Sequence, residues 1–363
     1  MASAKDSSNK IVYVTNLYPT ESRPYFGTFV ENSAEGLRAC GWDVTVLALP
    51  HFGEGAIAYI KFYFAVFKFL MGYSGIVYVH YISHSSLPVS LAKIFNKKLK
   101  IVLHYHGSDA FPESHEGKFR GVIKDTVCKL ANRSAVAMAA PSIYFANKLS
   151  SKFGLGVNQI IVSPSGGFNP EVFHPPAEKP SGRDGIIRVL FASRMLEEKG
   201  CLIAAKAALL IADKHLNVEF SFVGYGPLQG KVHQILEDLV SQGRCKLYGL
   251  LPQSELAAKF GEADLFLFPS YREGESLGLV VVEAMACGAF PLAFDRGALR
   301  EFLGGVERES LCSGLSDFSG LVNKTLSRDL SELGGLQSRV SALAGKYECK
   351  RVAEDLSAIM LDL

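Results

Sequence analysis

Short apolar runs alternate with helix-length segments along the whole chain, in two successive series. Such runs are too short for helices and are rich in Val, Ile and Phe, so they predict buried strands. The first series lies at residues 11–15, 43–49, 75–81, 100–104 and 135–140, and the second at 187–192, 218–223, 245–248, 264–268 and 289–293. Because parallel strands need a long crossover between them, the alternation predicts two parallel α/β sheets.

The segment 174–185 separates the two series and is rich in proline and glycine, which is typical of a linker. At the end of the chain, residues 347–363 carry apolar side chains at helical spacing and predict an amphipathic helix. We therefore expect one Rossmann-like domain at 1–175, a second at 186–346, and a final helix.

Composition fits an ordinary two-domain α/β protein, with 363 residues, 48% hydrophobic residues and 34 glycines. The seven cysteines are scattered and form no C-x-x-C pair, which favours a reducing compartment over a disulfide framework or a zinc site. The first ten residues are polar and resemble neither a signal peptide nor a transit helix. These features predict a cytoplasmic protein.

Charge is divided unevenly, because residues 1–180 carry 18 Lys and Arg against 12 Asp and Glu, whereas residues 181–363 carry 20 against 24. Within the basic half, segment 56–71 has Lys61 and Lys68 a heptad apart on an otherwise apolar and aromatic helix. Such a helix either lies in a membrane interface or packs in the protein with its lysines reaching solvent. Peripheral association with the inner face of the cell membrane is therefore a hypothesis, whereas nothing indicates nucleic-acid binding.

Two carboxylates, Glu275 and Glu283, flank a glycine-containing turn between a strand-like run and an apolar helix. A helix that begins after a parallel strand directs free N–H groups at the crevice, an arrangement suited to a phosphate. A plainer interpretation makes Glu275 a solvated loop residue and Glu283 a partner of the helix dipole.

A second polar signal follows the strand-like run 187–192, where Arg194 and Lys199 stand five residues apart and Gly200 comes next. Two cations at the end of a strand can hold a diphosphate. A further turn after the next strand contains Gly224 and Gly226. No D-x-D triplet occurs, so the sequence predicts neither a divalent metal nor another cofactor.

These segments resemble the glycosyltransferase 4 family, which carries an R-x4-K-G element, a G-x-G-P turn and an E-x7-E element in this order. The resemblance extends to the N-terminal half, through the loop that ends near Gly27 and through His106-Gly107-Ser108-Asp109. It implies the GT-B fold, in which two Rossmann-like domains face each other across a cleft and the last helix crosses back to the N-terminal domain.

The resemblance also implies a metal-independent hexosyltransferase that retains anomeric configuration. It would move a sugar from a UDP- or GDP-sugar to a hydroxyl of a glycan or lipid-linked acceptor, in the biosynthesis of cell-surface polysaccharide or glycoconjugates. Its catalytic residues would be His106, Arg194, Lys199 and Glu275. Its donor-binding residues would be Gly27, Asp109, Gly224, Gly226, Ser276, Leu277, Gly278, Leu279 and Glu283, the last on the ribose hydroxyls.

Three alternatives remain open from the sequence. A sugar-nucleotide epimerase or hydrolase of the same architecture would form product without an added acceptor. A nicotinamide-dependent oxidoreductase is disfavoured, because no G-x-G-x-x-G follows the first strand. A non-catalytic nucleotide-sugar-binding protein would leave the complete set of charged residues unexplained. His80 and His104 are interpreted as structural or acceptor-side residues.

Overall fold

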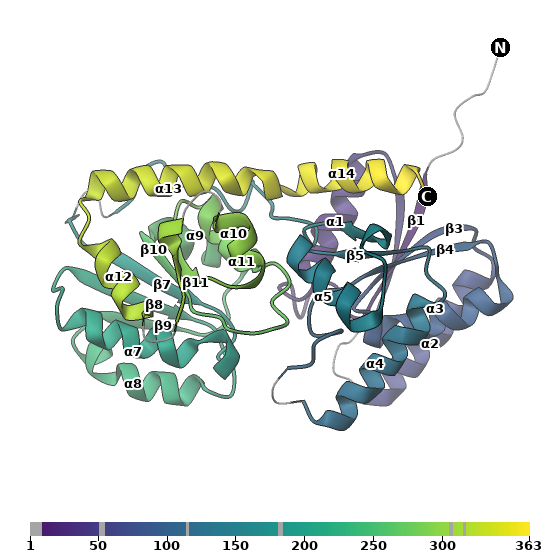
Figure 1. Cartoon of the computed structure of the whole chain (residues 1–363), viewed down its shortest axis with the longest axis horizontal. Coiled ribbons are helices and arrows are strands. Elements are labelled where there is room, and N and C mark those ends of the chain that lie inside the picture. The colour runs from purple at the N-terminus through teal and green to yellow at the C-terminus, as the bar shows by residue number, and fades with distance from the viewer. Residues whose placement is uncertain (1–8, 51–54, 114–115, 181–183, 305–307, 315–316) are drawn as a thin grey trace, which may run out of the picture. The chain divides into compact units, whose positions relative to one another are not determined.

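The computed structural model describes residues 9–50, 55–113, 116–180, 184–304, 308–314 and 317–363. The chain divides into two compact units; in Figure 1 the first runs from purple to teal and also includes the yellow helix at the end of the chain, and the second runs from teal to yellow. Met1–Gly167 and Cys349–Leu363 form the N-terminal unit, and Phe168–Glu348 forms the C-terminal unit. Each contains a six-stranded parallel sheet with helices packed on it, which confirms the predicted fold class and the two Rossmann-like sheets.

The N-terminal unit alternates strands and helices from its first strand onward, as a parallel sheet requires. Its elements are β1 (Lys10–Thr15), α1 (Thr28–Ala39), β2 (Asp43–Ala48), α2 (Gly55–Met71), β3 (Gly75–His80), α3 (Ile82–Phe95), β4 (Leu99–His104), α4 (Lys118–Asn132), β5 (Ala137–Ala140), α5 (Ile143–Phe153), β6 (Ile160–Val162) and α14 (Cys349–Leu361). The sheet order is β2-β1-β3-β4-β5-β6.

The C-terminal unit repeats the same alternation. Its elements are β7 (Ile187–Ala192), the 3-10 turn η2 (Glu197–Lys199), α7 (Cys201–Ala212), β8 (Val218–Val223), α8 (Gln229–Ser241), β9 (Cys245–Tyr248), α9 (Gln253–Glu262), β10 (Leu265–Phe268), α10 (Leu279–Ala286), β11 (Phe290–Phe294), α11 (Gly297–Leu303), β12 (Leu311–Cys312), α12 (Phe318–Leu326) and α13 (Leu330–Ala344). The sheet order is β12-β11-β10-β7-β8-β9.

Strand β1 explains why the strands read as continuous apolar runs. Its side chains alternate between two core clusters, with Val12 and Val14 in one and Ile11 and Tyr13 in the other. Both faces of the sheet are therefore buried, and neither face leaves room for the polar positions of a solvent-facing strand.

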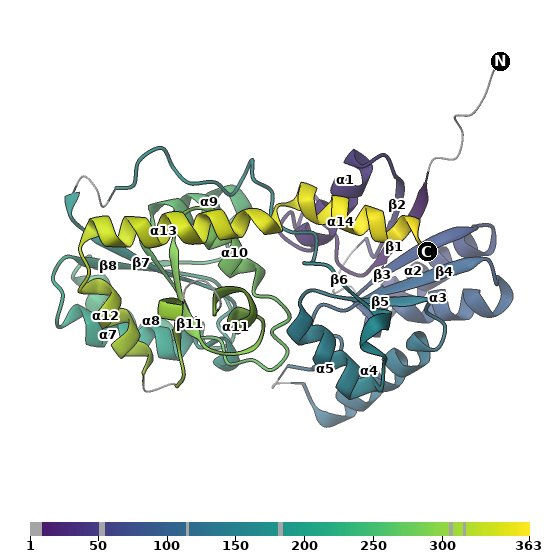
Figure 2. The same ribbon diagram turned by 45° about the horizontal axis from the view of Figure 1, so that its top comes forward.

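The final helix α14 packs on α1 within the N-terminal unit (Figure 2). Trp42 donates a hydrogen bond from Nε1 to Ser357 Oγ at 2.8 Å. A Cβ atom added to Gly36 would lie 2.6 Å from Cβ of Ala353, so the two helices approach closely at a residue without a side chain. The return of the last helix to the N-terminal unit agrees with the expected fold.

Two features differ from the sequence-based expectation. The sequence does not predict the edge strands β6 and β12. They have three and two residues, which are too few to show an alternating pattern. The division between the units falls at 167/168 instead of after residue 175. The proline-rich segment packs on the C-terminal unit, where Pro176 lies beside Gly261 and Lys179 Nζ donates to the Ala263 carbonyl. Residues 181–183 of the expected linker lie outside the described residues.

Among the described residues, none of the helices combines the length and the apolarity that crossing a membrane requires.

Candidate functional site

The candidate site of the C-terminal unit lies at the carboxyl ends of β7, β8 and β10. Strand β7 pairs with β8 on one side and with β10 on the other, so the order of strands reverses between β7 and β10. Loops diverge from the sheet at such a switch point and leave a crevice in which α/β proteins bind ligands. The loops that leave these strands carry Arg194, Lys199, Gly224, Gly226 and Glu275.

Lys199 and Glu275 form an ion pair between two of these loops. The Nζ atom of Lys199 lies 2.6 Å from Oε2 of Glu275, and the two side chains are 11% and 17% exposed. Ser270 donates a further hydrogen bond to the same oxygen at 3.0 Å. The carboxylate of Glu275 is therefore fixed by an ion pair and a hydrogen bond. This excludes the interpretation of Glu275 as a solvated loop residue.

The pKa of Glu275 reflects two opposed effects. Burial would raise it, but the charge of Lys199, its hydrogen bond, Arg272 and Ser270 together hold the pKa below the ordinary glutamate value. Arg272 also pairs with Glu198, with 3.2 Å between its Nε and Oε1 of that residue. Two ion pairs, Lys199–Glu275 and Arg272–Glu198, thus connect η2 with the loop after β10.

Arg194 is exposed and lies in the loop after β7, two residues beyond the end of the strand. This loop is fixed by the neighbouring turn, because Met195 N–H donates to the Tyr225 carbonyl at 2.8 Å and Leu228 N–H donates to the Met195 carbonyl at 3.1 Å. The G-x-G-P turn therefore positions the arginine loop through backbone hydrogen bonds.

Gly224 is needed for this close approach of the two loops. Its φ is +140°, and an added Cβ would lie 1.9 Å from the Ser193 carbonyl oxygen. Gly226 also abuts the loop after β7, where its added Cβ would lie 2.8 Å from the Met195 carbonyl oxygen. Both glycines thus shape the site through packing between loops.

Substitution of Gly224 by alanine is expected to lower the free energy of unfolding by about 2–4 kcal/mol, because the methyl group has no space and the backbone conformation disfavours it. Urea denaturation measures the change. The matched control is Gly230→Ala in α8, where the described surroundings leave the added Cβ in open space. That variant should gain up to about 1 kcal/mol, since alanine is the better helix former. Equal stabilities of the two variants would contradict the packing argument.

Helix α10 begins at Leu279, directly after Gly278 at its N-cap position. Ser276 and Leu277 lie in the preceding loop, and Leu277 is 3% exposed, so its backbone rather than its side chain faces any ligand. The first N–H groups of the helix point from the switch-point edge of the sheet and suit an anionic group.

Glu283 lies one turn inside α10 and is partly buried. Burial raises the pKa of its carboxyl group to about 8, and no charge or hydrogen bond from the described residues offsets this effect. A carboxyl group that burial has stripped of water and that lacks a protein donor can accept hydrogen bonds from a ligand hydroxyl.

The N-terminal unit gathers three histidines at the ends of β3 and β4. His80 and His104 are register partners, and the ring of His106 stacks on both, with centroid distances of 5.1 and 4.3 Å. Nδ1 of His80 and Nε2 of His106 are hydrogen-bonded at 2.9 Å, and Nδ1 of His106 lies 3.3 Å from Ser165 Oγ. The sequence identified His106 but not this stack, which only the register of the two strands creates.

All three histidines are uncharged at neutral pH. Burial lowers the pKa of His104 to about 3, and burial together with the neighbouring rings lowers the pKa of His80 and His106 well below the usual range. His106 is therefore a hydrogen-bonding group rather than a cation. One ring nitrogen from each of the three lies within 4.8 Å of the others. Among the described residues, this is the one cluster of His, Cys, Asp or Glu side chains whose ligand atoms are close enough to hold a metal ion.

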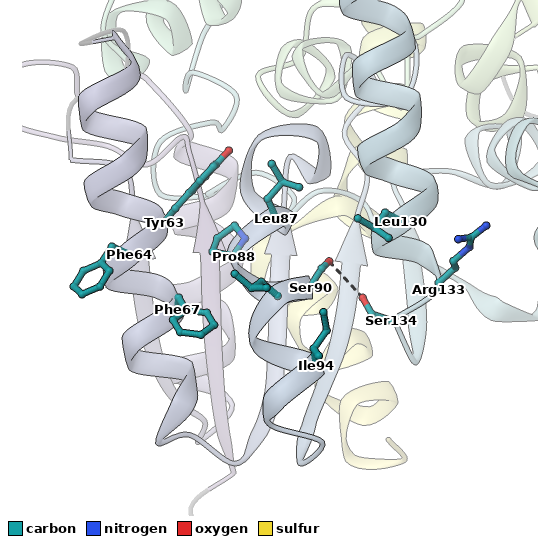
Figure 3. A pocket seen from close by; sticks show the side chains of 11 residues that line it. Tyr63, Phe64, Phe67, Leu87, Pro88, Ser90, Ile94, Leu130, Arg133 and Ser134 are labelled. Atoms are coloured by element: carbon teal, nitrogen blue, oxygen red, sulfur yellow. Dashed lines mark hydrogen bonds between the residues drawn. The ribbon is translucent and has the colours of Figure 1, made fainter.

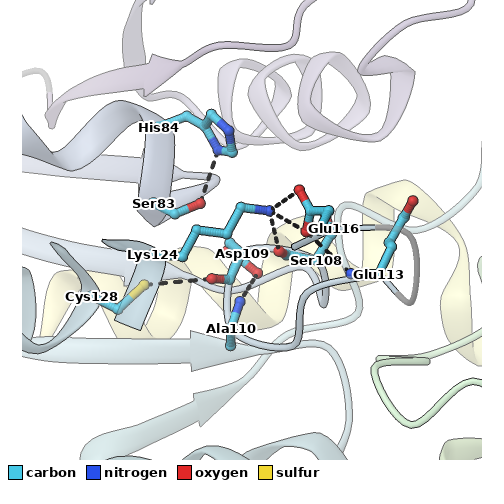
Figure 4. Close-up of polar contacts among 9 residues, drawn as sticks. All are labelled: Ser83, His84, Ser108, Asp109, Ala110, Glu113, Glu116, Lys124 and Cys128. Carbon is cyan, nitrogen blue, oxygen red and sulfur yellow. Dashed lines mark hydrogen bonds and ion pairs between the residues drawn. The ribbon is translucent and has the colours of Figure 1, made fainter. Parts of the chain in front are cut away.

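Asp109 supports the loop that carries His106. Both of its carboxylate oxygens accept the His106 N–H, at 3.1 and 3.2 Å, and Oδ1 also accepts from the Gly107 N–H. Oδ1 accepts a further hydrogen bond from the Ala110 N–H at 3.1 Å, which Figure 4 shows. Asp109 is fully buried, and burial raises its pKa to about 6 despite these bonds. Any effect of Asp109 on a donor would therefore act through the shape of this loop.

A buried cation supports the same loop from α4, as Figure 4 shows. Lys124 Nζ lies 2.7 Å from both carboxylate oxygens of Glu116 and donates to the Ser108 carbonyl at 3.1 Å. The sequence did not identify Lys124 or Glu116, because their pairing depends on tertiary structure.

Gly27 precedes α1 at the end of the loop after β1, next to the backbone of Leu17.

Comparison with known proteins agrees with this geometry. Residues 177–315 match the family described as Glycosyl transferases group 1. The chain is 30% identical over 211 residues to a D-inositol 3-phosphate glycosyltransferase of Pseudarthrobacter chlorophenolicus, which covers 56% of this chain and 47% of that protein. It is 24% identical over 339 residues, 81% of this chain and 83% of the relative, to TuaC of Bacillus subtilis, whose name assigns it to teichuronic acid biosynthesis.

The fold is shared with solved structures. Anabaena Alr3699/HepE in complex with UDP and glucose superposes with a TM-score of 0.73 and 19% identity, over 98% of this chain and 100% of that chain. The GT-B fold class and the resemblance to glycosyltransferases are thereby confirmed. The chain spans about half the length of the D-inositol 3-phosphate glycosyltransferase that it matches. The assignment to family 4 and the roles of individual residues stay predictions.

Proposed function

We propose that this chain, whose residues 177–315 match the glycosyl transferases of group 1, transfers a sugar from a nucleotide diphosphate sugar to a hydroxyl of an acceptor glycan. The observation that carries the proposal is the Lys199–Glu275 ion pair at a switch point, beside the first turn of α10. This arrangement offers cations, free backbone N–H groups and a held carboxylate at one edge of the sheet. A diphosphate joined to a sugar needs all three.

We assign each group at this edge the part that the resemblance to glycosyltransferases implies. Arg194 and Lys199 neutralise the diphosphate, and the N–H groups at the start of α10 share its oxygens. Glu283 accepts hydrogen bonds from the ribose hydroxyls, and Glu275 contacts the donor sugar. We assign no divalent metal to the reaction, because the two cations take its place. His106 acts in the transfer step as an uncharged hydrogen-bonding group.

The reaction breaks the bond between the anomeric carbon and the diphosphate oxygen and forms one to the acceptor oxygen. We propose that the acceptor attacks from the face that the diphosphate leaves, so that configuration is retained. The acceptor hydroxyl proton passes to the departing phosphate oxygen, and the charge of the leaving group is carried by the cations. The nucleoside diphosphate and the glycosylated acceptor are the products.

Two relationships support the choice of substrates. The structure of HepE contains UDP and glucose, which favours a uridine donor with a hexose here. The name of TuaC places that relative in teichuronic acid biosynthesis, which favours a cell-surface polysaccharide or a lipid-linked precursor as the acceptor. The proteins matched are glycosyltransferases, so transfer to an acceptor is preferred over epimerisation, hydrolysis or binding without catalysis.

Calorimetric titration with UDP, GDP and their common sugar conjugates in metal-free buffer tests the donor site. One nucleotide family is expected to bind, and Arg194→Ala and Glu283→Ala should each weaken binding by about tenfold or more. The matched control is Lys324→Ala, which removes an exposed cation from α12 of the same unit. Absence of binding to any of these nucleotides, or equal losses in the control, would refute the proposed donor site.

A further inference from the structure

The outward faces of α2, α3 and α4 are unusually apolar for surface helices. Thirteen of the twenty-five exposed large hydrophobic side chains in the described chain lie on these three helices. They include Ile60 and Phe64 on α2, Leu91 and Ile94 on α3, and Phe119 and Val122 on α4, with exposed fractions from 49% to 77%. A surface helix normally turns a polar stripe outward, whereas these helices carry large apolar side chains on their outward faces as well as on their buried ones.

A groove of about 610 Å³ runs between the three helices. Figure 3 shows Phe64 and Phe67 of α2 on one side, Leu130 of α4 on the other, and Leu87 and Ile94 of α3 between them. Ser90 and Ser134 lie in it with their hydroxyl groups 3.5 Å apart. Its volume and apolar lining suit a hydrocarbon chain.

Cations surround this apolar face. No Asp or Glu occurs between residues 55 and 108, whereas this stretch carries six lysines, and Lys61, Lys68, Lys97 and Lys98 are exposed. Arg133, directly after α4, lines the groove, and Lys129 is exposed one turn earlier on that helix. Two acidic residues of α4 and its approach form ion pairs, Asp125 with Lys152 and Glu116 with Lys124.

The sign of this charge selects the partner. Two copies of the chain that met symmetrically through this face would bring lysines against lysines, which costs free energy. An anionic surface with an apolar interior satisfies both features, because it attracts the lysines and buries the aromatic and aliphatic side chains. We propose that α2, α3 and α4 form a docking surface for a bilayer containing anionic phospholipids, with one hydrocarbon chain of the bilayer in the groove.

The inference extends the membrane hypothesis from segment 56–71 to a face of three helices with a hydrocarbon site. The docking itself is independent of the donor site. Its consequence for the acceptor rests on the proposed function, because a transferase held on the membrane through its N-terminal unit meets lipid-linked acceptors there. Vesicle binding and nucleotide binding must therefore be measured on the same samples.

Co-sedimentation with vesicles of phosphatidylcholine, with and without roughly one third phosphatidylglycerol, tests the proposal. The protein is expected to bind the anionic vesicles, and binding should weaken when NaCl rises from about 0.1 M to about 0.5 M. Phe64→Glu/Ile94→Glu and Lys61→Gln/Lys68→Gln should each reduce binding by about tenfold or more, since each pair removes part of one attraction. The matched control is Leu216→Glu, an 88% exposed apolar residue of the other unit, which should leave binding unchanged.

Tryptophan fluorescence tests the groove separately, because the sole tryptophan, Trp42, is 5% exposed. A tryptophan introduced at Leu91 should be quenched by lipids brominated on their acyl chains, whereas one introduced at Leu216 should not. Vesicle binding that both face variants retain would overturn the proposal. So would absence of vesicle binding together with a dimer that the face variants dissociate, because the occupant would then be a second copy. Loss of nucleotide binding alone would count against the proposed function and leave the docking surface intact.

Discussion

Replacing Lys199 with methionine is expected to lower kcat/KM for the nucleotide sugar by about 10³-fold, with the reaction followed by the release of nucleoside diphosphate. The ammonium group is one of two cations assigned to the diphosphate, and its effect grows as negative charge develops on the leaving group. Interactions that strengthen in the transition state appear in kcat, so kcat should fall more than KM rises. Initial rates across a range of donor concentrations separate the two parameters.

The same substitution also affects stability, and this effect must be separated from catalysis. Without Lys199, burial dominates at Glu275, and the pKa of its carboxyl group rises. A buried carboxylate that has lost its main partner costs about 3 kcal/mol of unfolding free energy. The double variant Lys199→Met/Glu275→Gln removes the charge altogether and should recover most of this loss, while its activity stays low.

A surface ion pair in the same unit provides the control. At the end of α9, Nζ of Lys259 lies 2.8 Å from Oε2 of Glu262, and the two side chains are 22% and 48% exposed. Lys259→Met should change stability by less than about 1 kcal/mol and leave kcat/KM unaltered. If the double variant regained both stability and activity, Lys199 would be a structural partner of Glu275 and not a catalytic residue.

The sequence located the polar residues of the site through their spacing, but it could not describe their environment. Lys199 and Glu275 were each found after an apolar run, because parallel strands expose their carboxyl ends at one edge of a sheet. Their ion pair joins residues 76 positions apart, so it depends on the pairing of β7 with β10, which no local pattern encodes. Ser270 and Arg272, which fix Glu275, were missed for the same reason.

Burial was the second property that the sequence did not reveal. The sequence allows segment 56–71 to be either an interfacial or a packed helix. In the structure, one stripe of α2 packs inward through Phe62, Val66 and Leu70, while the opposite stripe is apolar and exposed. Packing is therefore confirmed for one stripe of the helix, and the exposed stripe is the part to which the membrane proposal applies. The continuation of the exposed face onto α3 and α4 requires the crossover geometry of the sheet, which places these helices side by side.

Affinity for a nucleotide sugar is expected to rise by about 10²-fold between about pH 6 and about pH 8, and to level off above that range. The reason is Glu283, whose pKa of about 8 keeps it protonated in the ligand-free protein at neutral pH. Ribose hydroxyls donate hydrogen bonds to the ionised form, so binding must remove the proton. Below the pKa, each pH unit therefore costs about tenfold in affinity. A nucleotide sugar is the suitable ligand, because its diphosphate has no group that titrates in this range.

Glu283→Gln should abolish this dependence, because an amide oxygen accepts the same hydrogen bonds without titrating. The variant is expected to bind better than the unmodified protein near pH 6 and more weakly near pH 9, so the two affinity curves should cross. Calorimetry in buffers with different ionisation enthalpies should detect a proton released on binding to the unmodified protein and none with the variant. Glu255→Gln, at an exposed position of α9, is the control and should leave the curve unchanged. Parallel curves for the unmodified protein and Glu283→Gln would place the ribose elsewhere, because the only group proposed to lose a proton on binding would then have no part in it.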